Sequence, residues 1–155
     1  MGWNSYNLDR KAQELVLKYR DKGVLNQSHK MRLAVPYGLE RFWGEHIRLI
    51  NRNDPKDKIA GEYWRDTWDK LVEIMELAQI DVPNDAIDYS SKNQDQQIKQ
   101  MAKKLWDTET FTLDDRQITL DVLTQLCDSL VWWTQRYKKK GESQDEPDRQ
   151  VADEA

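Results

Sequence analysis

Two glutamates three positions apart, Glu73 and Glu76, have the spacing of a metal-binding pair. Side chains at i and i+3 share one face of a helix and lie close enough to hold a divalent cation together. An all-helical, magnesium-dependent nucleotide hydrolase would need a second acidic pair on the following helix, but residues 96–106 of the helix expected there contain no acid. We therefore interpret the acidic ladder around the pair as a solvated helix face; it consists of Glu62, Asp66, Asp69, Glu73 and Glu76.

The sequence supports a catalytic nucleophile no better than it supports a metal site. A serine or cysteine nucleophile requires a histidine within reach, and neither His29 nor His46 lies in a recognisable motif. We expect both histidines at the surface or at the boundary of the core. The single cysteine, Cys127, cannot form an internal disulfide and is expected to be a small core residue. Since a glycine-rich phosphate loop is also missing, the sequence predicts no catalytic residues, no metal site and no cofactor.

Cationic side chains gather in three segments that could bind phosphate. In QQIKQMAKKLW, residues 96–106, Lys99 and Lys103 are four apart and no acid relieves them within the segment. Like charges at this spacing cost a few tenths of a kcal/mol, so an external anion is a reasonable compensator. Each cation that meets a phosphate would add salt-dependent, sequence-independent affinity. The candidate nucleic-acid-binding residues of the three segments are Arg48, Arg52, Lys99, Lys103, Lys104, Arg136, Lys138, Lys139 and Lys140.

The segment LVWWTQRYKKKG, residues 130–141, also has a purely structural explanation. Cations in the last turn of a helix stabilise its dipole by ~0.3–1 kcal/mol, whatever else they contact. Trp133 lies on the apolar stripe of the expected helix and is predicted to be core, whereas Trp132, about 100° away, is predicted at the edge. We therefore expect the aromatic residues here mostly to pack and the lysines mostly to face solvent.

Charge is unevenly distributed along the 155 residues, whose net charge is −4. Residues 142–155 hold six acids and one base, whereas residues 1–141 are near neutral. We predict a helical bundle domain over residues 1–141 and an acidic, disordered tail over residues 142–155. No window approaches ~18 uninterrupted apolar residues, and the beginning of the chain lacks a signal-peptide core. A cytoplasmic protein is therefore expected.

Helix start and stop signals divide the chain into helical pieces. Pro36 should break a helical stretch in two, and Asp54 before Pro55 marks a helix start. Thr112 with Asp115 resembles a capping box that opens the last and longest helix. The expected helices are Leu8–Lys22 with Asn7 as N-cap, Ser28–Val35, Tyr37–Arg52, Pro55 to about Gln79, Ser90 or Ser91 to Trp106, and Leu113 to about Lys140.

Apolar stripes place the core of this bundle. Spacings of three and four residues predict a buried face on the helix from Pro55, formed by Trp64, Trp68, Leu71, Met75 and Ala78 and widened by Tyr63, Ile74 and Leu77. On the last helix they predict a stripe of Leu123, Leu126, Leu130, Trp133 and Tyr137. This last helix is apolar over so much of its circumference that it should be central. The fold class is all-α, a single bundle of five or six helices with a long central C-terminal helix.

Two stretches carry a likeness to a known family: MRLAVPYGLERFWGEHIRLI, residues 31–50, and LTQLCDSLVWWTQRYKKKG, residues 123–141. With the chain length and the helix-only pattern, they make residues 1 to about 141 resemble the small subunit of a CRISPR–Cas effector complex. The resemblance is greatest to the helical small subunit of type I-D Cascade, which corresponds to the C-terminal part of the large subunit. It is a likeness of the whole chain and not a motif match.

The resemblance implies a non-catalytic role. Small subunits of this family line the inner face of a complex of guide RNA and protein, packed beside one another and against the large subunit. Their cations contact the backbone of the target or of the displaced strand. The partners implied are the other subunits of a crRNA-containing effector complex, the target nucleic-acid backbone and copies of this chain, with no membrane.

Two other functions remain open from the sequence. A helical protein–protein adaptor would use the aromatic stripes and the charges for protein contacts only. A metal-dependent nucleotide pyrophosphohydrolase would depend on Glu73 and Glu76. Salt-dependent binding to arbitrary single-stranded nucleic acid separates nucleic-acid binding from the adaptor, and magnesium-dependent nucleoside triphosphate turnover would indicate the hydrolase.

Overall fold

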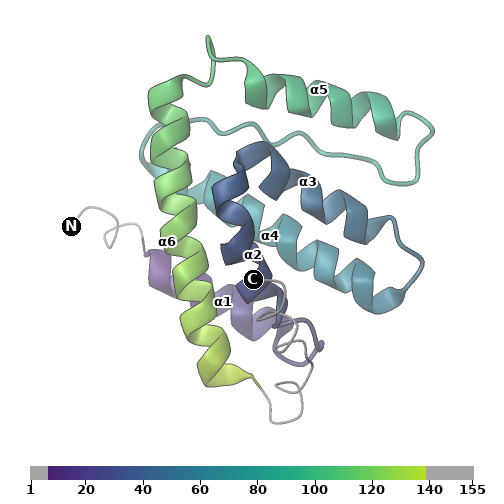
Figure 1. The fold of residues 1–155 in the computed structure, drawn as a ribbon, viewed down its shortest axis with the longest axis vertical. Helices are drawn as coiled ribbons and strands as arrows, with labels where there is room; N and C mark the ends of the chain where they lie inside the picture. The colour runs from purple at the N-terminus through teal and green to yellow at the C-terminus, as the bar shows by residue number, and fades with distance from the viewer. Residues whose placement is uncertain (1–6, 139–155) are drawn as a thin grey trace.

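A computed structural model describes residues 7–138 of the chain, and within this range the regular structure is entirely helical. The prediction of an all-α bundle with a long C-terminal helix is confirmed (Figure 1). Its elements are α1 (Leu8–Tyr19), α2 (Gln27–Ala34), the 3₁₀ turn η2 (Val35–Tyr37), α3 (Leu39–Ile50), α4 (Pro55–Leu77), α5 (Gln94–Trp106) and α6 (Leu113–Tyr137). The predicted tail and the domain boundary at residue 141 lie outside the described residues.

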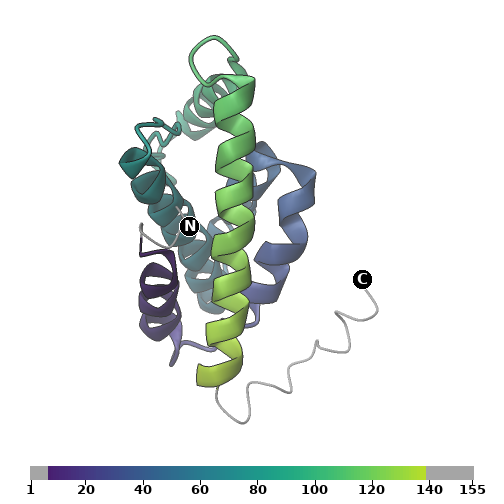
Figure 2. The ribbon, with the colours of Figure 1, turned by 90° about the vertical axis from the view of Figure 1, so that its left-hand side faces the viewer.

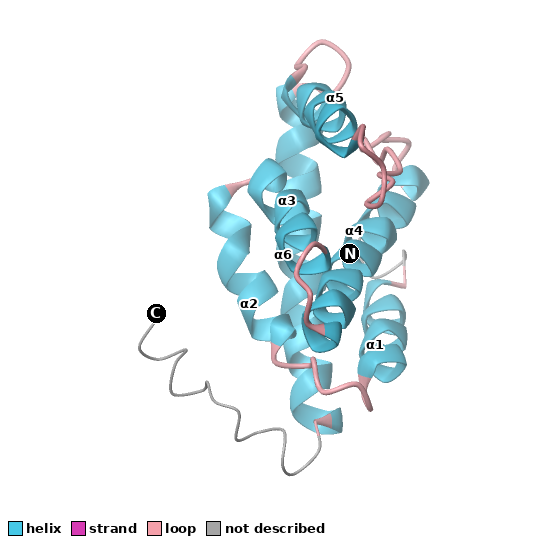
Figure 3. Cartoon of the chain, turned by 90° about the vertical axis from the view of Figure 1, so that its right-hand side faces the viewer, coloured by secondary structure: helices cyan, strands magenta, loops and turns pink. Residues whose placement is uncertain are grey.

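Helix α6 runs the length of the bundle. In the view of Figure 2, α1 and α4 lie on one side of it and α2 lies on the other. Helix α5 lies across the end of the bundle at which α6 begins (Figure 3), and the segment 78–93 runs back beneath it (Figure 1). The apolar circumference of α6 is thus explained by neighbours on several sides, as its pattern predicts. None of the helices within residues 7–138 has the length and apolar character of a membrane span.

Local sequence determines where several helices begin. The Asp54 carboxylate accepts a hydrogen bond from the Lys56 backbone N–H at 2.8 Å, with Pro55 in the first turn. The Thr112 hydroxyl likewise accepts from the Asp115 N–H at 3.1 Å. Both predicted caps are confirmed. The expected cap at Asn7 is not, because Asn7 has φ +58° and its side chain makes no capping hydrogen bond.

Breaks between helices follow proline and glycine. Helix α2 ends at Ala34, one turn containing Pro36 follows, and Gly38 at φ +104° starts the chain in the direction of α3. Helix α1 ends at Tyr19 rather than at Lys22, since the backbone turns through residues 20–23 and Gly23 takes φ +74°. Pro36 and Gly38 therefore mark the break between α2 and α3, whereas Gly23 lies four residues beyond the end of α1.

The core contains most of the residues that the apolar stripes select. Trp64, Trp68, Leu71 and Met75 of α4 are buried, and so are the stripe leucines of α6. Leu77 is a wrong prediction: it is exposed in the last turn of α4. Trp133 and Tyr137 are half-buried against the core, with their rings stacked 5.6 Å apart.

Hydroxyl groups inside the bundle join three helices. The Ser28 hydroxyl of α2 lies 2.6 Å from the Tyr63 hydroxyl of α4 and 2.7 Å from the Thr134 hydroxyl of α6. All three residues are fully buried, and burial raises the pKa of Tyr63, so its phenol stays neutral. Buried hydroxyls that satisfy one another cost little to desolvate. The chain of hydrogen bonds therefore fixes the register of α2 and α4 on α6.

Candidate nucleic-acid interface

One face of α5 presents cations that have no carboxylate partner among residues 7–138. Met101 and Leu105 bury the inner side of α5, so residues on the opposite side of the helix point to solvent. Lys99 and Lys103 are exposed there, and no carboxylate of the described chain lies within 4 Å of either ammonium group. Trp106, seven residues after Lys99, shares this face and is 62% exposed. We name Lys99, Lys103 and Trp106 the α5 cationic face.

The third lysine of this helix is bound within the fold. The Lys104 Nζ lies 2.8 Å from the Asp85 Oδ1, in the segment beneath α5. The same segment receives Gln97, whose side-chain oxygen accepts the Asp88 backbone N–H at 2.8 Å. Lys104 therefore helps to hold the segment 82–89 against α5 and is turned away from Lys99 and Lys103.

The second predicted segment, at the end of α3, is neutralised by its own fold. Arg48 binds Glu45, with the Nε–Oε2 distance at 2.8 Å, and this hydrogen bond raises the pKa of Arg48. Arg52 lies 3.4 Å from the Asp57 Oδ2. Both pairs are solvent-exposed and each contributes on the order of 0–1 kcal/mol to stability. Each of these two candidate nucleic-acid-binding arginines therefore already has a carboxylate partner.

The third predicted segment lies at the other end of the bundle. The Arg136 guanidinium stacks on Trp132 with its Cζ 3.7 Å from the ring centroid, and its Nη1 donates to the Trp132 carbonyl. Lys138 is the half-buried C-cap of α6, and Lys139 and Lys140 lie outside the described residues. The 25 residues of α6 separate this end from α5 by about 36 Å. The three segments therefore do not form one continuous surface.

The acidic ladder of α4 binds α1. The Lys11 Nζ lies 3.0 Å from the Glu73 Oε1, and its hydrogen bond lowers the pKa of Glu73. Asp66 accepts from Lys18 at 2.7 Å and from the Tyr19 hydroxyl at 2.5 Å. No group of three or more His, Cys, Asp or Glu side chains within residues 7–138 is placed to hold a metal. Two members of the ladder thus act as inter-helix contacts.

Helix α5 contains one carboxylate, Asp95. The helix begins at Gln94, ahead of the acid-free residues 96–106 on which the exclusion of a magnesium site was based. Asp95 stands alone in the exposed first turn, where a carboxylate interacts favourably with the helix dipole. A single carboxylate does not supply the second acidic pair that a magnesium site of this type would need.

His46 is buried, contrary to the expectation of a surface or boundary position. Its side chain is 2% exposed and lies between the rings of Trp43 and Tyr89. The Nδ1 atom is 2.5 Å from the Trp43 carbonyl oxygen, which can only accept, so Nδ1 carries the proton. The Nε2 atom then accepts from the Tyr89 hydroxyl at 2.5 Å. Burial lowers the pKa of His46 to about 4, so the imidazole is neutral and structural at neutral pH.

This lowered pKa predicts a pH dependence of stability. Because the unfolded chain binds a proton near pH 6.5 and the folded chain near pH 4, His46 favours the folded state fully above pH 6.5. That contribution is lost as the pH falls from 6.5 to 4, by about 3 kcal/mol in total. The measurement is urea unfolding of the wild type and of His46→Gln between pH 7 and 4. The difference between their unfolding free energies should shrink by this amount, and a constant difference would contradict the assignment.

Cys127 is a fully buried thiol of α6, as predicted. Desolvation raises its pKa, which keeps the sulfur as the unreactive thiol. It fills space among the core leucines of the same helix. Its role is therefore packing.

The α5 cationic face combines two kinds of contact that a single nucleic-acid strand uses. Ammonium groups neutralise phosphates, and an exposed indole offers a flat surface on which a base can stack. The two lysines are identifiable from the sequence, and helical spacing from Lys99 and Lys103 also places Trp106 beside them, although no role was predicted for Trp106. No protein-family model, curated protein or solved structure matches this chain.

Proposed function

We propose that this chain is a non-catalytic, cytoplasmic subunit of a ribonucleoprotein complex, with the role of a CRISPR–Cas small subunit. In this role it contacts the backbone of a single nucleic-acid strand through the α5 cationic face. The observation that carries the proposal is a pair of lysines, Lys99 and Lys103, that have no carboxylate partner in the described part of the chain, followed by the exposed Trp106 on the same side of α5. The all-helical fold is compatible with such a subunit, and the sequence resemblance supplies the type of complex and the other subunits as partners.

The energetics favour this face over the predicted cations that are already paired. A cation already paired with a carboxylate must lose that pair before it binds phosphate, which applies to Arg48, Arg52 and Lys104. Lys99 and Lys103 have no such cost. Each phosphate neutralised on a single strand changes log K by about −0.7 per log unit of salt, so two contacts contribute about 25-fold in affinity at ~0.1 M salt.

A helical protein–protein adaptor is the second candidate. It is favoured by the internal pairing of Arg48, Arg52 and Lys104 and by the exposure of Leu33 and Tyr37 beside one another on α2 and η2. An adaptor of this kind would bind proteins at all salt concentrations and would show no affinity for a bare oligonucleotide.

The experiment is fluorescence anisotropy of a labelled oligothymidylate titrated with the full chain. Lys99→Ala/Lys103→Ala should weaken binding about 25-fold at ~0.1 M salt. Lys22→Ala/Lys56→Ala is the matched control, because it removes the same net charge from exposed residues near the loop between α1 and α2. The control should bind within about 3-fold of the wild type. Equal losses in both variants, or an absence of binding by the wild type, would refute the proposal.

A further inference from the structure

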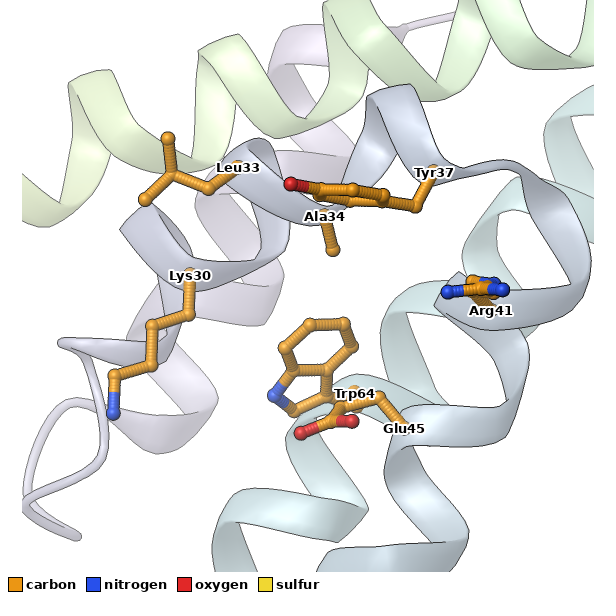
Figure 4. A pocket seen from close by; sticks show the side chains of 7 residues that line it. All are labelled: Lys30, Leu33, Ala34, Tyr37, Arg41, Glu45 and Trp64. Carbon is orange, nitrogen blue, oxygen red and sulfur yellow. The ribbon is translucent and has the colours of Figure 1, made fainter. Parts of the chain in front are cut away.

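A groove lies between α2 with η2 on one side and α3 with α4 on the other. Its volume is about 430 Å³. Figure 4 shows Leu33, Ala34 and Tyr37 on one wall, with the indole of Trp64 facing them from the other side. A hollow of this size accommodates one or two large side chains.

The fold does not use the apolar wall of this groove. Leu33 is 48% exposed and Tyr37 is 69% exposed. The opposite side of α2 packs on α6, where Met31 is buried and Arg32 binds Asp128 at 2.6 Å. Leu33 and Tyr37 therefore remain as an exposed apolar pair that neither helix packing nor a hydrogen bond of the described chain explains.

The floor of the groove, formed by the indole ring of Trp64, is apolar as well. Trp64 is almost fully buried, and its indole N–H donates to the Gln27 side-chain oxygen at 2.7 Å. Because that polar atom is already satisfied, what the indole offers to the groove is the carbon surface of its ring. An apolar side chain would lose no hydrogen bond on entering.

The charges around the groove are positive. Lys30 and Arg41 lie on either side of the hollow (Figure 4), and neither has a carboxylate of the described chain within 4 Å. The only acid of the lining within the described residues, Glu45, is neutralised by Arg48. An occupant should therefore carry negative charge beside its apolar part.

We propose that this groove binds an acidic segment of a partner protein. One large apolar side chain of that segment inserts between Tyr37, Leu33 and the Trp64 floor, and carboxylates beside it meet Lys30 and Arg41. A protein fits better than a nucleic acid because Leu33 and Ala34 form an aliphatic wall, and among the aromatic rings here only Tyr37 is open enough to stack a base. The groove and the α5 cationic face are built from different helices, so this inference does not depend on the proposed function.

The test uses the full chain and three labelled synthetic peptides. EDELFDEE carries the expected chemistry, KKKLFKKK reverses its charge, and EDESSDEE lacks its apolar anchor. Of the three peptides, we expect only EDELFDEE to show saturable binding. Tyr37→Ser and Leu33→Ser should each weaken it by about 10-fold or more. Leu17→Ser, an exposed leucine of α1 outside the groove lining, is the matched control and should leave it unchanged.

Charge reversal provides a gain of binding that a merely unstable variant cannot produce. Lys30→Glu/Arg41→Glu should lose EDELFDEE and bind KKKLFKKK instead. Lys99→Ala/Lys103→Ala should bind EDELFDEE as the wild type does, which separates this site from the proposed nucleic-acid face. Failure of the wild type to bind EDELFDEE, or equal binding of all three peptides, would overturn the inference.

Other occupants would also overturn it, and each has its own result. A second copy of the chain is indicated if sedimentation shows a dimer that Tyr37→Ser abolishes. The chain's own C-terminal tail is indicated if a full-length variant with amides in place of the carboxylates of residues 142–155 binds EDELFDEE at least about 10-fold more tightly. A nucleic acid is indicated if Tyr37→Ser weakens oligothymidylate binding and leaves peptide binding unchanged.

Discussion

Changing Gly61 to alanine is expected to destabilise the protein by about 2 kcal/mol, although alanine is the better helix former. A Cβ at Gly61 would lie 2.6 Å from the Ile50 Cγ1, 2.9 Å from the Ile50 backbone nitrogen and 3.0 Å from the His46 carbonyl oxygen. Two of these atoms belong to the backbone of α3, so relief requires α3 and α4 to move apart. Overpacking of this kind costs up to ~3 kcal/mol, which exceeds the gain of ~1 kcal/mol in helix propensity.

Gly44 offers a matched control on the neighbouring helix. It lies inside α3, and a Cβ there would meet no atom of the described residues within 4 Å. Gly44→Ala should therefore stabilise the protein by about 0.5–1 kcal/mol, because alanine loses less backbone entropy on folding. Urea unfolding followed by circular dichroism measures both variants. A change of the same sign in both would show that α3 and α4 do not approach one another as closely as described.

Replacing Trp68 and Trp106 with alanine should have opposite consequences. Trp68 is 1% exposed, and its indole N–H donates to the Pro83 carbonyl at 3.2 Å, which ties the segment beneath α5 to α4. Trp68→Ala should cost about 3–5 kcal/mol in unfolding free energy. Trp106→Ala should change stability by less than about 0.5 kcal/mol. It should nevertheless weaken oligothymidylate binding by about 5-fold to 150-fold, the range that corresponds to one stacked base.

Trp132 is the control for this functional effect. It is exposed like Trp106 but lies at the far end of α6, where Arg136 stacks on it. Trp132→Ala should leave oligonucleotide affinity unchanged in the same anisotropy titration. If Trp132→Ala weakens binding as much as Trp106→Ala, the contact surface lies elsewhere or the tryptophans act nonspecifically.

Much of the fold could be predicted because its signals are local. A capping side chain and the backbone N–H that it binds are two or three residues apart. Asp54 and Thr112 therefore predict where α4 and α6 begin. The apolar spacing of α4 and α6 likewise depends only on residues of one helix, and it selected most of their buried side chains correctly. The Glu45–Arg48 pair, three residues apart, was also within reach of the sequence argument.

The remainder depends on partners far apart in the chain. Nothing in the sequence near His46 indicates that the hydroxyl of Tyr89, forty-three residues later, will form a hydrogen bond with its imidazole inside the fold. From the sequence alone, Ser28 and Thr134 resemble surface residues. They can be buried because α2 packs on α6, where their hydroxyls form a hydrogen bond although they are 106 residues apart in the chain. Lys104 is paired because it faces Asp85, which lies on a segment whose path no helical periodicity predicts. Separating paired from unpartnered cations therefore required the fold.

The salt dependence of oligothymidylate binding tests the central claim most directly. If Lys99 and Lys103 each neutralise one phosphate, the slope of log K against log salt should become less negative by about 1.4 in Lys99→Ala/Lys103→Ala. The slope of Lys22→Ala/Lys56→Ala should equal that of the wild type. An identical slope in all three proteins would contradict the claim that the α5 cationic face binds a polynucleotide backbone.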